Sequence, residues 1–215
     1  MRRAVAVSAA PVLGFILLLL IHAWTPVARL DAAVSDAFRG YGEARPGWVA
    51  VLRVVTDAAS TLPVLVAGLA VVVMLAVWGA RRRAAVVAAT VLVVWALWSL
   101  MHWLVYRPRP EDGFVDVAAY GFPSGHTSNA AVVAVLAVWL LWPRLPTRAA
   151  RVAVAAAAAG FAGLIGLTRV ALLAHWPTDV LGGWLLVLAV FPVLLSALRA
   201  RAPVPESQPA RGYAG

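Results

Sequence analysis

The chain has 215 residues, of which 63% are hydrophobic and 13% are charged, and its formal net charge is +9 at pH 7. A soluble globular protein is about 45–50% apolar and about 25% charged, so this composition excludes an ordinary soluble domain and indicates a membrane protein. All 18 basic residues are Arg and no Cys is present. This excludes catalysis by Lys, disulfides, zinc sites built on Cys and thiol nucleophiles.

Six apolar windows are long enough to cross a bilayer, for which a helix needs about 20 residues. They cover approximately residues 4–23, 58–80, 84–105, 124–142, 152–173 and 180–198. The first window could also be a secretory signal segment, but no clean small-residue cleavage site follows it, so we interpret it as a retained helix. We therefore predict an all-α polytopic membrane protein with one six-span domain over residues 1–201 and a disordered tail over residues 202–215.

The Arg residues are unevenly divided between the two sides of these spans. Eleven of the 18 Arg residues and one acid fall on the side that holds both termini, whereas seven Arg and eight acids fall on the other. By the positive-inside rule both termini are cytoplasmic, and three loops, at about residues 24–57, 106–123 and 174–179, face outward. The positive charge is thus a topology signal, and we expect no nucleic-acid partner.

The long first outward loop contains a candidate interfacial helix. One helical face would carry apolar side chains and the opposite face polar ones: Leu30, Ala33, Val34, Ala37 and Phe38 against Asp31, Ser35, Asp36 and Arg39. A solvated connector that ends at residues 40–42 is an alternative interpretation.

The other two outward loops carry many polar groups beside bilayer spans. One region runs from His102 through Arg107 and Arg109-Pro110 to Pro123-Ser124-Gly125-His126, and the other contains Thr168-Arg169, His175 and Asp179. Ionisable groups at membrane depth are costly and indicate function by default. Snorkelling to the interface is the alternative for Arg169.

These residue types fit a phosphate site. Ser124 would cap a helix whose N-terminus stabilises an anion, and Gly125 would let the backbone approach the phosphate closely. Arg109 and Arg169 could donate charge-assisted hydrogen bonds to phosphate oxygens, on which charge also develops in the transition state of phosphoryl transfer.

Two histidines could divide the chemistry. His175 fits a nucleophile oriented by Asp179, which Pro177 would place in the first turn of the last helix. His126 would protonate the leaving oxygen and then activate water. Taken singly, each His could be an interfacial hydrogen-bonding residue.

Other chemistries fit less well. A metal site of His126, His175 and Asp179 would lack a close pair of His ligands on one helical face, so we expect no metal and no other cofactor. The acids Glu111, Asp112 and Asp116 fit a solvated loop better than a cation site, and Asn129 fits an interhelical hydrogen bond.

Together these motifs resemble those of the type 2 phosphatidic acid phosphatase (PAP2) superfamily of membrane phosphatases, which also includes the vanadium haloperoxidases. The family's Pro-Ser-Gly-His motif is intact at 123–126, and its Ser-Arg-x5-His-x3-Asp motif is present at 168–179 with Thr168 in place of Ser. Its Lys-x6-Arg-Pro motif keeps Arg109-Pro110, but His102 stands where the family has Lys.

The resemblance implies a PAP2-like helical core with His175 as nucleophile, Asp179 as its partner and His126 as acid and base. It assigns phosphate binding to Arg109, Ser124, Gly125 and Arg169, and by position to His102, although Arg107 could supply the charge that the missing Lys would carry. The implied activity is metal-independent hydrolysis, at the outer face of the cell membrane, of a lipid phosphomonoester or diphosphate through a phosphohistidine.

Phosphatidic acid, phosphatidylglycerophosphate and an isoprenoid diphosphate are the substrate classes implied by the family. The altered first motif leaves an alternative, a membrane protein that binds or translocates a phosphorylated lipid without catalysis. A haloperoxidase shares the site residues but not usually the membrane spans. The sequence selects neither a substrate nor an oligomeric state.

Overall fold

The computed structural model describes residues 2–117 and 120–200, which are helical apart from turns and loops, and the expected tail over residues 202–215 lies outside them. One isolated bridge, between Pro108 and Tyr120, joins the two ends of the loop before residue 125. The elements are α1 (Arg2–Ile21), α2 (Thr25–Glu43), α3 (Pro46–Asp57), α4 (Thr61–Val77), α5 (Arg81–Leu104), α6 (Gly125–Leu141), a 3₁₀ turn (Trp142–Arg144), α7 (Arg148–Ala171) and α8 (Pro177–Ala200).

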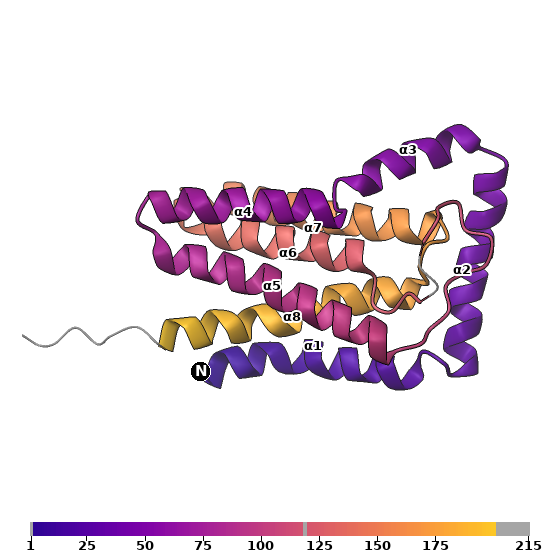
Figure 1. Cartoon of the computed structure of the whole chain (residues 1–215), viewed down its shortest axis with the longest axis horizontal. Helices are drawn as coiled ribbons and strands as arrows, with labels where there is room; N and C mark the ends of the chain where they lie inside the picture. The colour runs from indigo at the N-terminus through magenta and orange to yellow at the C-terminus, as the bar shows by residue number, and fades with distance from the viewer. Residues whose placement is uncertain (1, 118–119, 201–215) are drawn as a thin grey trace, which may run out of the picture.

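Figure 1 shows α2 crossing one end of a bundle whose helices lie along the long axis of the molecule: α1, α4, α5, α6, α7 and α8. Helix α1 packs on α8, α4 packs on α5, and α6 packs on both α7 and α8. The N-terminus lies beside the end of α8, so both ends of the described chain lie at the end of the bundle opposite α2 (Figure 1).

The helices agree with the predicted membrane architecture. Five helical segments, one of which joins α3 and α4, are long and apolar enough to cross a bilayer. A sixth candidate combines Ser8–Ile21 with α2 across a bend of 92°. Since α2 lies across the bundle, α1 supplies the apolar length of this sixth span, and the predicted total of six is reached.

The first outward loop is more ordered than the sequence pattern indicated. Nearly all of residues 24–57 belong to α2 and α3, instead of one short helix or a solvated connector. Pro26 and Pro46 stand in the first turns of these helices, where the missing N–H group has no helical partner to lose. Our expectation therefore missed α3 altogether.

Helix α2 turns part of its polar face toward the protein. Asp31 and Ser35 are buried with 1% of their surface exposed, whereas Leu30 is 63% exposed. Asp31 points into the protein because it has buried partners there, whereas Asp36 on the same polar face is exposed.

Helix α3 covers the end of α7 through a separate hydrophobic cluster. Val49 and Leu52 of α3 pack with Ala171, Leu172 and Ala174, which follow one another through the end of α7 and the turn after it. Phe38, Trp48, Phe114 and Val115 enclose the cluster. This packing fixes α3 above the segment that carries the predicted nucleophile.

Candidate active site

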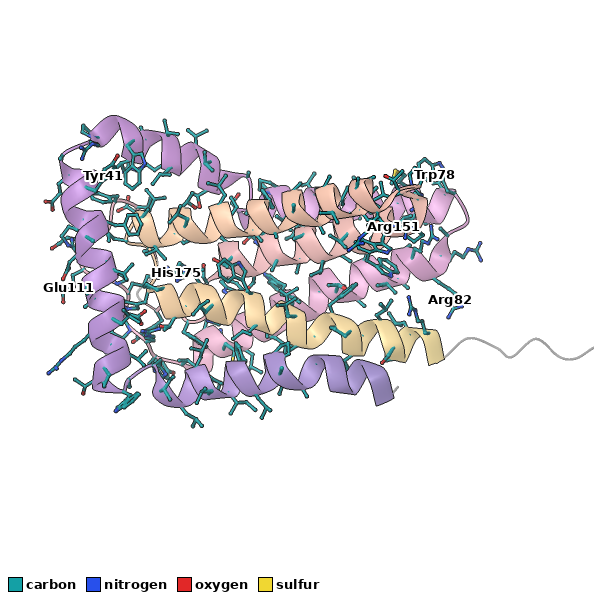
Figure 2. All side chains as sticks on the ribbon, turned by 180° about the vertical axis from the view of Figure 1, so that it is seen from behind. Tyr41, Trp78, Arg82, Glu111, Arg151 and His175 are labelled. Atoms are coloured by element: carbon teal, nitrogen blue, oxygen red, sulfur yellow. The ribbon has the colours of Figure 1, made fainter. Side chains whose placement is uncertain are left out.

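Buried polar groups gather at the α2 end of the bundle. Figure 2 shows His175 at this end, whereas Arg82 and Arg151 lie at the opposite end. The buried polar residues near His175 come from five segments of the chain: Asp31, Thr56, Arg107, Ser124, Thr168, Arg169, Thr178 and Asp179. An apolar bundle retains such groups only where they find partners or serve chemistry.

The turn after α7 places His175. Leu173 adopts the left-handed conformation, with φ of 53°, and the backbone N–H groups of Ala174 and His175 both donate to the carbonyl of Arg169 at 3.0 and 3.2 Å. This closes the end of α7 in the manner of a Schellman-type cap, with Leu where Gly is usual. His175 is consequently fixed with only 2% of its surface exposed.

Asp179 lies in the first turn of α8, as predicted, and faces His175. Its Oδ2 atom lies 3.5 Å from Nδ1 of His175 and accepts a hydrogen bond from the backbone N–H of Trp176 at 3.0 Å. Its Oδ1 atom accepts from Nη1 of Arg107 at 2.5 Å. The carboxylate is therefore fully buried but paired and hydrogen-bonded.

Arg109 touches the other nitrogen of the His175 ring. Its Nη1 atom lies 2.8 Å from Nε2 of His175 and 2.5 Å from the carbonyl oxygen of Ala174, and its Nε donates to the carbonyl of Tyr120. A guanidinium can only donate, so Nε2 must accept and carry an unshared electron pair. The neutral ring then holds its proton on Nδ1, toward Asp179.

The surroundings of His175 keep the ring neutral. Burial, and then the positive charges of Arg109 and Arg169, hold the pKa of His175 well below its usual value of 6.5. Burial also lowers the pKa of Arg109, and the nearby Asp179 partly offsets this. At pH 7 Nε2 of His175 is therefore unprotonated and holds an electron pair, which faces Arg109 in this structure.

His126 and Arg169 line a cavity of about 540 Å³ beside this pair. Ligand sites have volumes of about 300–1,000 Å³, so this cavity is of the size of a ligand site. Arg169 is buried and donates to Oγ1 of Thr56 at 3.1 Å, while its Nε has no partner among the described residues. This unsatisfied donor is suited to an anion. The remaining wall comes from α3 and from the loop between α5 and α6: Arg53, Thr56, Asp57 and residues 113–117.

Ser124 is the N-cap residue of α6, as predicted, but its side chain makes no capping hydrogen bond. Its Oγ accepts from Thr127 at 2.9 Å, and its backbone N–H donates to the Asp179 carbonyl at 3.0 Å, so this N–H is not free for an anion. A Cβ on Gly125 would come within 2.9 Å of the Trp98 indole, which gives this glycine a packing reason as well.

His102 lies in the last turn of α5, with its ring centroid 4.5 Å from that of Trp98. Its Nδ1 atom is buried and has no hydrogen-bond partner among the described residues. His102 does not line the cavity that holds His126 and Arg169. His102 therefore lies outside the cavity, and its ring nitrogen Nδ1 is free of hydrogen bonds to the described residues.

Arg107 does not replace the missing Lys. Its guanidinium is buried between Asp31 and Asp179 and also contacts Thr178, so it is committed to protein partners.

In the third motif, Thr168 uses its hydroxyl to donate to the carbonyl of Ile165 at 2.6 Å.

Several residues of the site were missed from the sequence. Arg39 donates to the carbonyls of Glu111 and Asp112, and Arg53 donates to that of Phe114, so α2 and α3 hold the loop that carries Arg109. For α3 a sequence signal was present: Arg53 and Thr56 stand three residues apart, as on one face of a helix, within a segment that we interpreted as a loop.

Two glycines of α8 were missed as well. A Cβ on Gly182 would approach the Phe122 ring to 2.8 Å, and one on Gly183 would approach the Ser124 carbonyl oxygen to 2.9 Å. The Gly182-Gly183 pair, one turn after Asp179, therefore lets the segment before α6 lie against α8.

The other polar residues serve the fold. Asn129 donates to the carbonyl of Ala59 at 3.1 Å, so its partner lies in the turn between α3 and α4 and not in another helix as expected. Within the described part of the chain, no three His, Asp or Glu side chains are grouped closely enough to hold a metal ion.

Comparison with known proteins agrees with this geometry. A model of the PAP2 superfamily matches residues 99–202, a range that contains all the predicted site residues. The crystal structure of a transmembrane PAP2-type phosphatidylglycerolphosphate phosphatase from Bacillus subtilis is similar, with 25% sequence identity and a TM-score of 0.77 over 90% of this chain and 94% of that one. No curated protein sequence gives a significant match.

Proposed function

We propose that this membrane protein, whose residues 99–202 match the model of the PAP2 superfamily, hydrolyses a lipid phosphomonoester or diphosphate through a phosphohistidine. The observation that carries the proposal is the buried pair of His175 and Asp179, whose geometry leaves Nε2 of His175 unprotonated beside Arg109. A protein that only binds or translocates a lipid has no need of a nucleophile oriented in this way.

In the proposed reaction, the electron pair on Nε2 of His175 forms a bond to phosphorus while the bond to the lipid oxygen breaks. His126 gives its proton to that leaving oxygen. Asp179, whose Oδ2 atom lies 3.5 Å from Nδ1, stabilises the positive charge that develops on the ring. Water then attacks the phosphohistidine, His126 takes a proton from the water, and phosphate leaves with His175 restored.

Arg109 and Arg169 supply the charge that the phosphoryl oxygens need. In the structure Nη1 of Arg109 donates a hydrogen bond to Nε2 of His175, and this bond must break before Nε2 can attack phosphorus. A dianionic phosphate is a stronger acceptor than a neutral imidazole, so substrate binding draws Arg109 onto the phosphate. Arg169 offers its unpartnered Nε from the cavity wall. Ser124, Gly125 and His102 are the further phosphate contacts in this proposal.

The side of the membrane follows from the Arg distribution. The site lies at the end of the bundle opposite the two ends of the described chain (Figure 1). Arg82 and Arg151 lie at the end of the bundle away from His175 (Figure 2), and they belong to the Arg-rich set that the positive-inside rule places in the cytoplasm. The site is therefore proposed to face outward, where it would receive lipids of the outer leaflet.

The substrate class is proposed from the family and the cavity. The structurally similar Bacillus subtilis protein is a phosphatidylglycerolphosphate phosphatase. The cavity holds Arg53, Asp57 and Asp116 in addition to His126 and Arg169, so it offers charges of both signs to a polar headgroup. Phosphatidylglycerophosphate, phosphatidic acid and an isoprenoid diphosphate are accordingly the substrates to compare.

The test is phosphate release from these lipids by purified protein in excess chelator, beside the His175→Ala variant. We expect metal-independent turnover by the wild type and a loss of about three orders of magnitude or more in the variant, because the nucleophile is removed. Equal release by both proteins would refute the mechanism, and loss of turnover on chelation would refute metal independence. Binding of the lipids without release from any of them would favour the non-catalytic alternative.

A further inference from the structure

A buried ionic cluster beside the His175–Asp179 pair has no part in the proposed reaction. It consists of Arg107, Asp31 and Thr178, whose exposed fractions are 7%, 1% and 7%. Asp31 comes from α2 and Thr178 from α8, so the cluster ties the helix that crosses the bundle to the start of the helix that carries Asp179.

Each arm of the Arg107 guanidinium has a different carboxylate. Nη1 donates to Oδ1 of Asp179 at 2.5 Å and to Oγ1 of Thr178 at 2.6 Å, whereas Nη2 donates to Oδ2 of Asp31 at 2.6 Å. Asp31 also accepts from the backbone N–H and the hydroxyl of Thr178, at 3.1 and 2.6 Å. Both oxygens of Asp31 are thus occupied, and its position is fixed.

This division matters because a guanidinium commonly binds one carboxylate through two parallel hydrogen bonds. If both arms of Arg107 turned to Asp179, they would take Oδ1 and Oδ2 together. Oδ2 is the oxygen that faces Nδ1 of His175. An Arg107 without a second partner would therefore compete with His175 for its orienting carboxylate.

We propose that Asp31 is a positioning residue for the reaction: it holds one arm of Arg107 away from Asp179 and so reserves Oδ2 of Asp179 for His175. The proposal rests on the proposed phosphohistidine chemistry. It gives α2, which contains none of the family motifs, a defined effect on the nucleophile through Arg107 and Asp179.

The kinetic test compares Asp31→Asn with Ser35→Ala in purified protein of verified folding and melting temperature. The Asp31→Asn substitution keeps the size of the side chain but removes the charge that holds Nη2, so we expect kcat to fall about 10- to 100-fold, as is common for residues that orient a reactive group. KM should change by less than about twofold, because the groups proposed to bind phosphate do not touch Asp31. Ser35 is buried on the same face of α2 and its hydroxyl has no partner among the described residues, so Ser35→Ala is the matched control and should retain wild-type kcat.

A second measurement does not depend on turnover. Nitrogen-15 NMR of the labelled histidines at pH 7 should show His175 with its proton on Nδ1 in the wild type and in Ser35→Ala. In Asp31→Asn a larger share of the proton should be on Nε2, because Arg107 then takes Oδ2 of Asp179, the oxygen that faces Nδ1. If the wild type cleaves no lipid phosphate, the proposed function fails, and the tautomer measurement still decides whether Asp31 acts on His175.

A double variant separates positioning from a general structural role. The ammonium of Arg107→Lys cannot bind Asp179 with two arms, so adding Asp31→Asn in that background should cost much less than in the wild type. Equal costs in both backgrounds, or an unchanged His175 tautomer in Asp31→Asn, would overturn the proposal.

Discussion

The site end of the molecule has two parts that differ in what their sequence reveals. The ends of α6, α7 and α8 carry Ser124, His126, Arg169, His175 and Asp179 at fixed spacings. The cap formed by α2 and α3 contributes Asp31, Arg39, Arg53 and Thr56, which contact partners 61 to 147 residues away and follow no short motif. Reactive groups must keep their mutual spacing, whereas groups that hold them in place can come from any element nearby.

Among variants that keep His126 and His175, removal of the Arg109 charge should cause the largest loss of activity. Arg109→Gln loses a donor to the phosphate and to Nε2 of His175, so kcat/KM should fall by about two to three orders of magnitude.

The pH profile of Arg109→Gln gives a sharper test. The positive charge of Arg109 lowers the pKa of His175, so its removal raises this pKa. His175 must be neutral to attack, and hence the acid limb of kcat/KM in the wild type should lie below pH 6.5 and move to higher pH in the variant. A limb that stays in place or moves to lower pH would contradict the assignment of His175.

Disruption of the contact between α8 and the segment before α6 should cause the next largest loss of activity. Gly183→Ala places a Cβ 2.9 Å from the carbonyl oxygen of Ser124, a backbone atom that cannot move without displacing the start of α6. We expect kcat to fall about tenfold or more, because a small misplacement of a catalytic group is costly. Gly160→Ala on α7 is the control, since its Cβ would meet no atom within 4 Å, and a similar loss in both variants would contradict the explanation.

Removal of the Thr56 hydroxyl, which belongs to the cap formed by α2 and α3, should have a smaller effect on catalysis than the variants above. The hydroxyl of Thr56 accepts one hydrogen bond from Nη1 of Arg169, and Thr56→Val removes it with little change in volume. KM should rise by about two- to tenfold, because the net contribution of a typical hydrogen bond is about 0.5–1.5 kcal/mol. Steady-state kinetics on the best substrate measures this, and a loss as large as that of Arg109→Gln would show that the cap takes part in the chemistry itself.

The prediction of the fold succeeded where apolar length alone was decisive. Each predicted span overlaps a helix of the bundle, and Pro177 opens α8 as expected. For α2, amphipathic periodicity identified two faces of the helix but not which residues on them find partners in the protein. Asp31 is buried because Arg107 and Thr178 lie opposite it, a fact that arises only in three dimensions.

The prediction of the site shows the same limit. Arg109, His175 and Asp179 do meet, and His126 and Arg169 share a cavity. The partners of Arg107 were not foreseeable, since its position two residues before Arg109 made it a candidate phosphate ligand while the structure commits it to two carboxylates. Neither could Gly183 be foreseen, because its importance depends on a backbone atom of Ser124.

The central claim is that phosphorus passes through His175, and rapid quenching tests it directly. Protein mixed with a lipid labelled in its terminal phosphate should carry acid-labile, base-stable label on His175 within one turnover, and this label should leave as inorganic phosphate when unlabelled substrate is added. Label that is absent from the protein during turnover, or that maps to a residue other than His175, would contradict the mechanism.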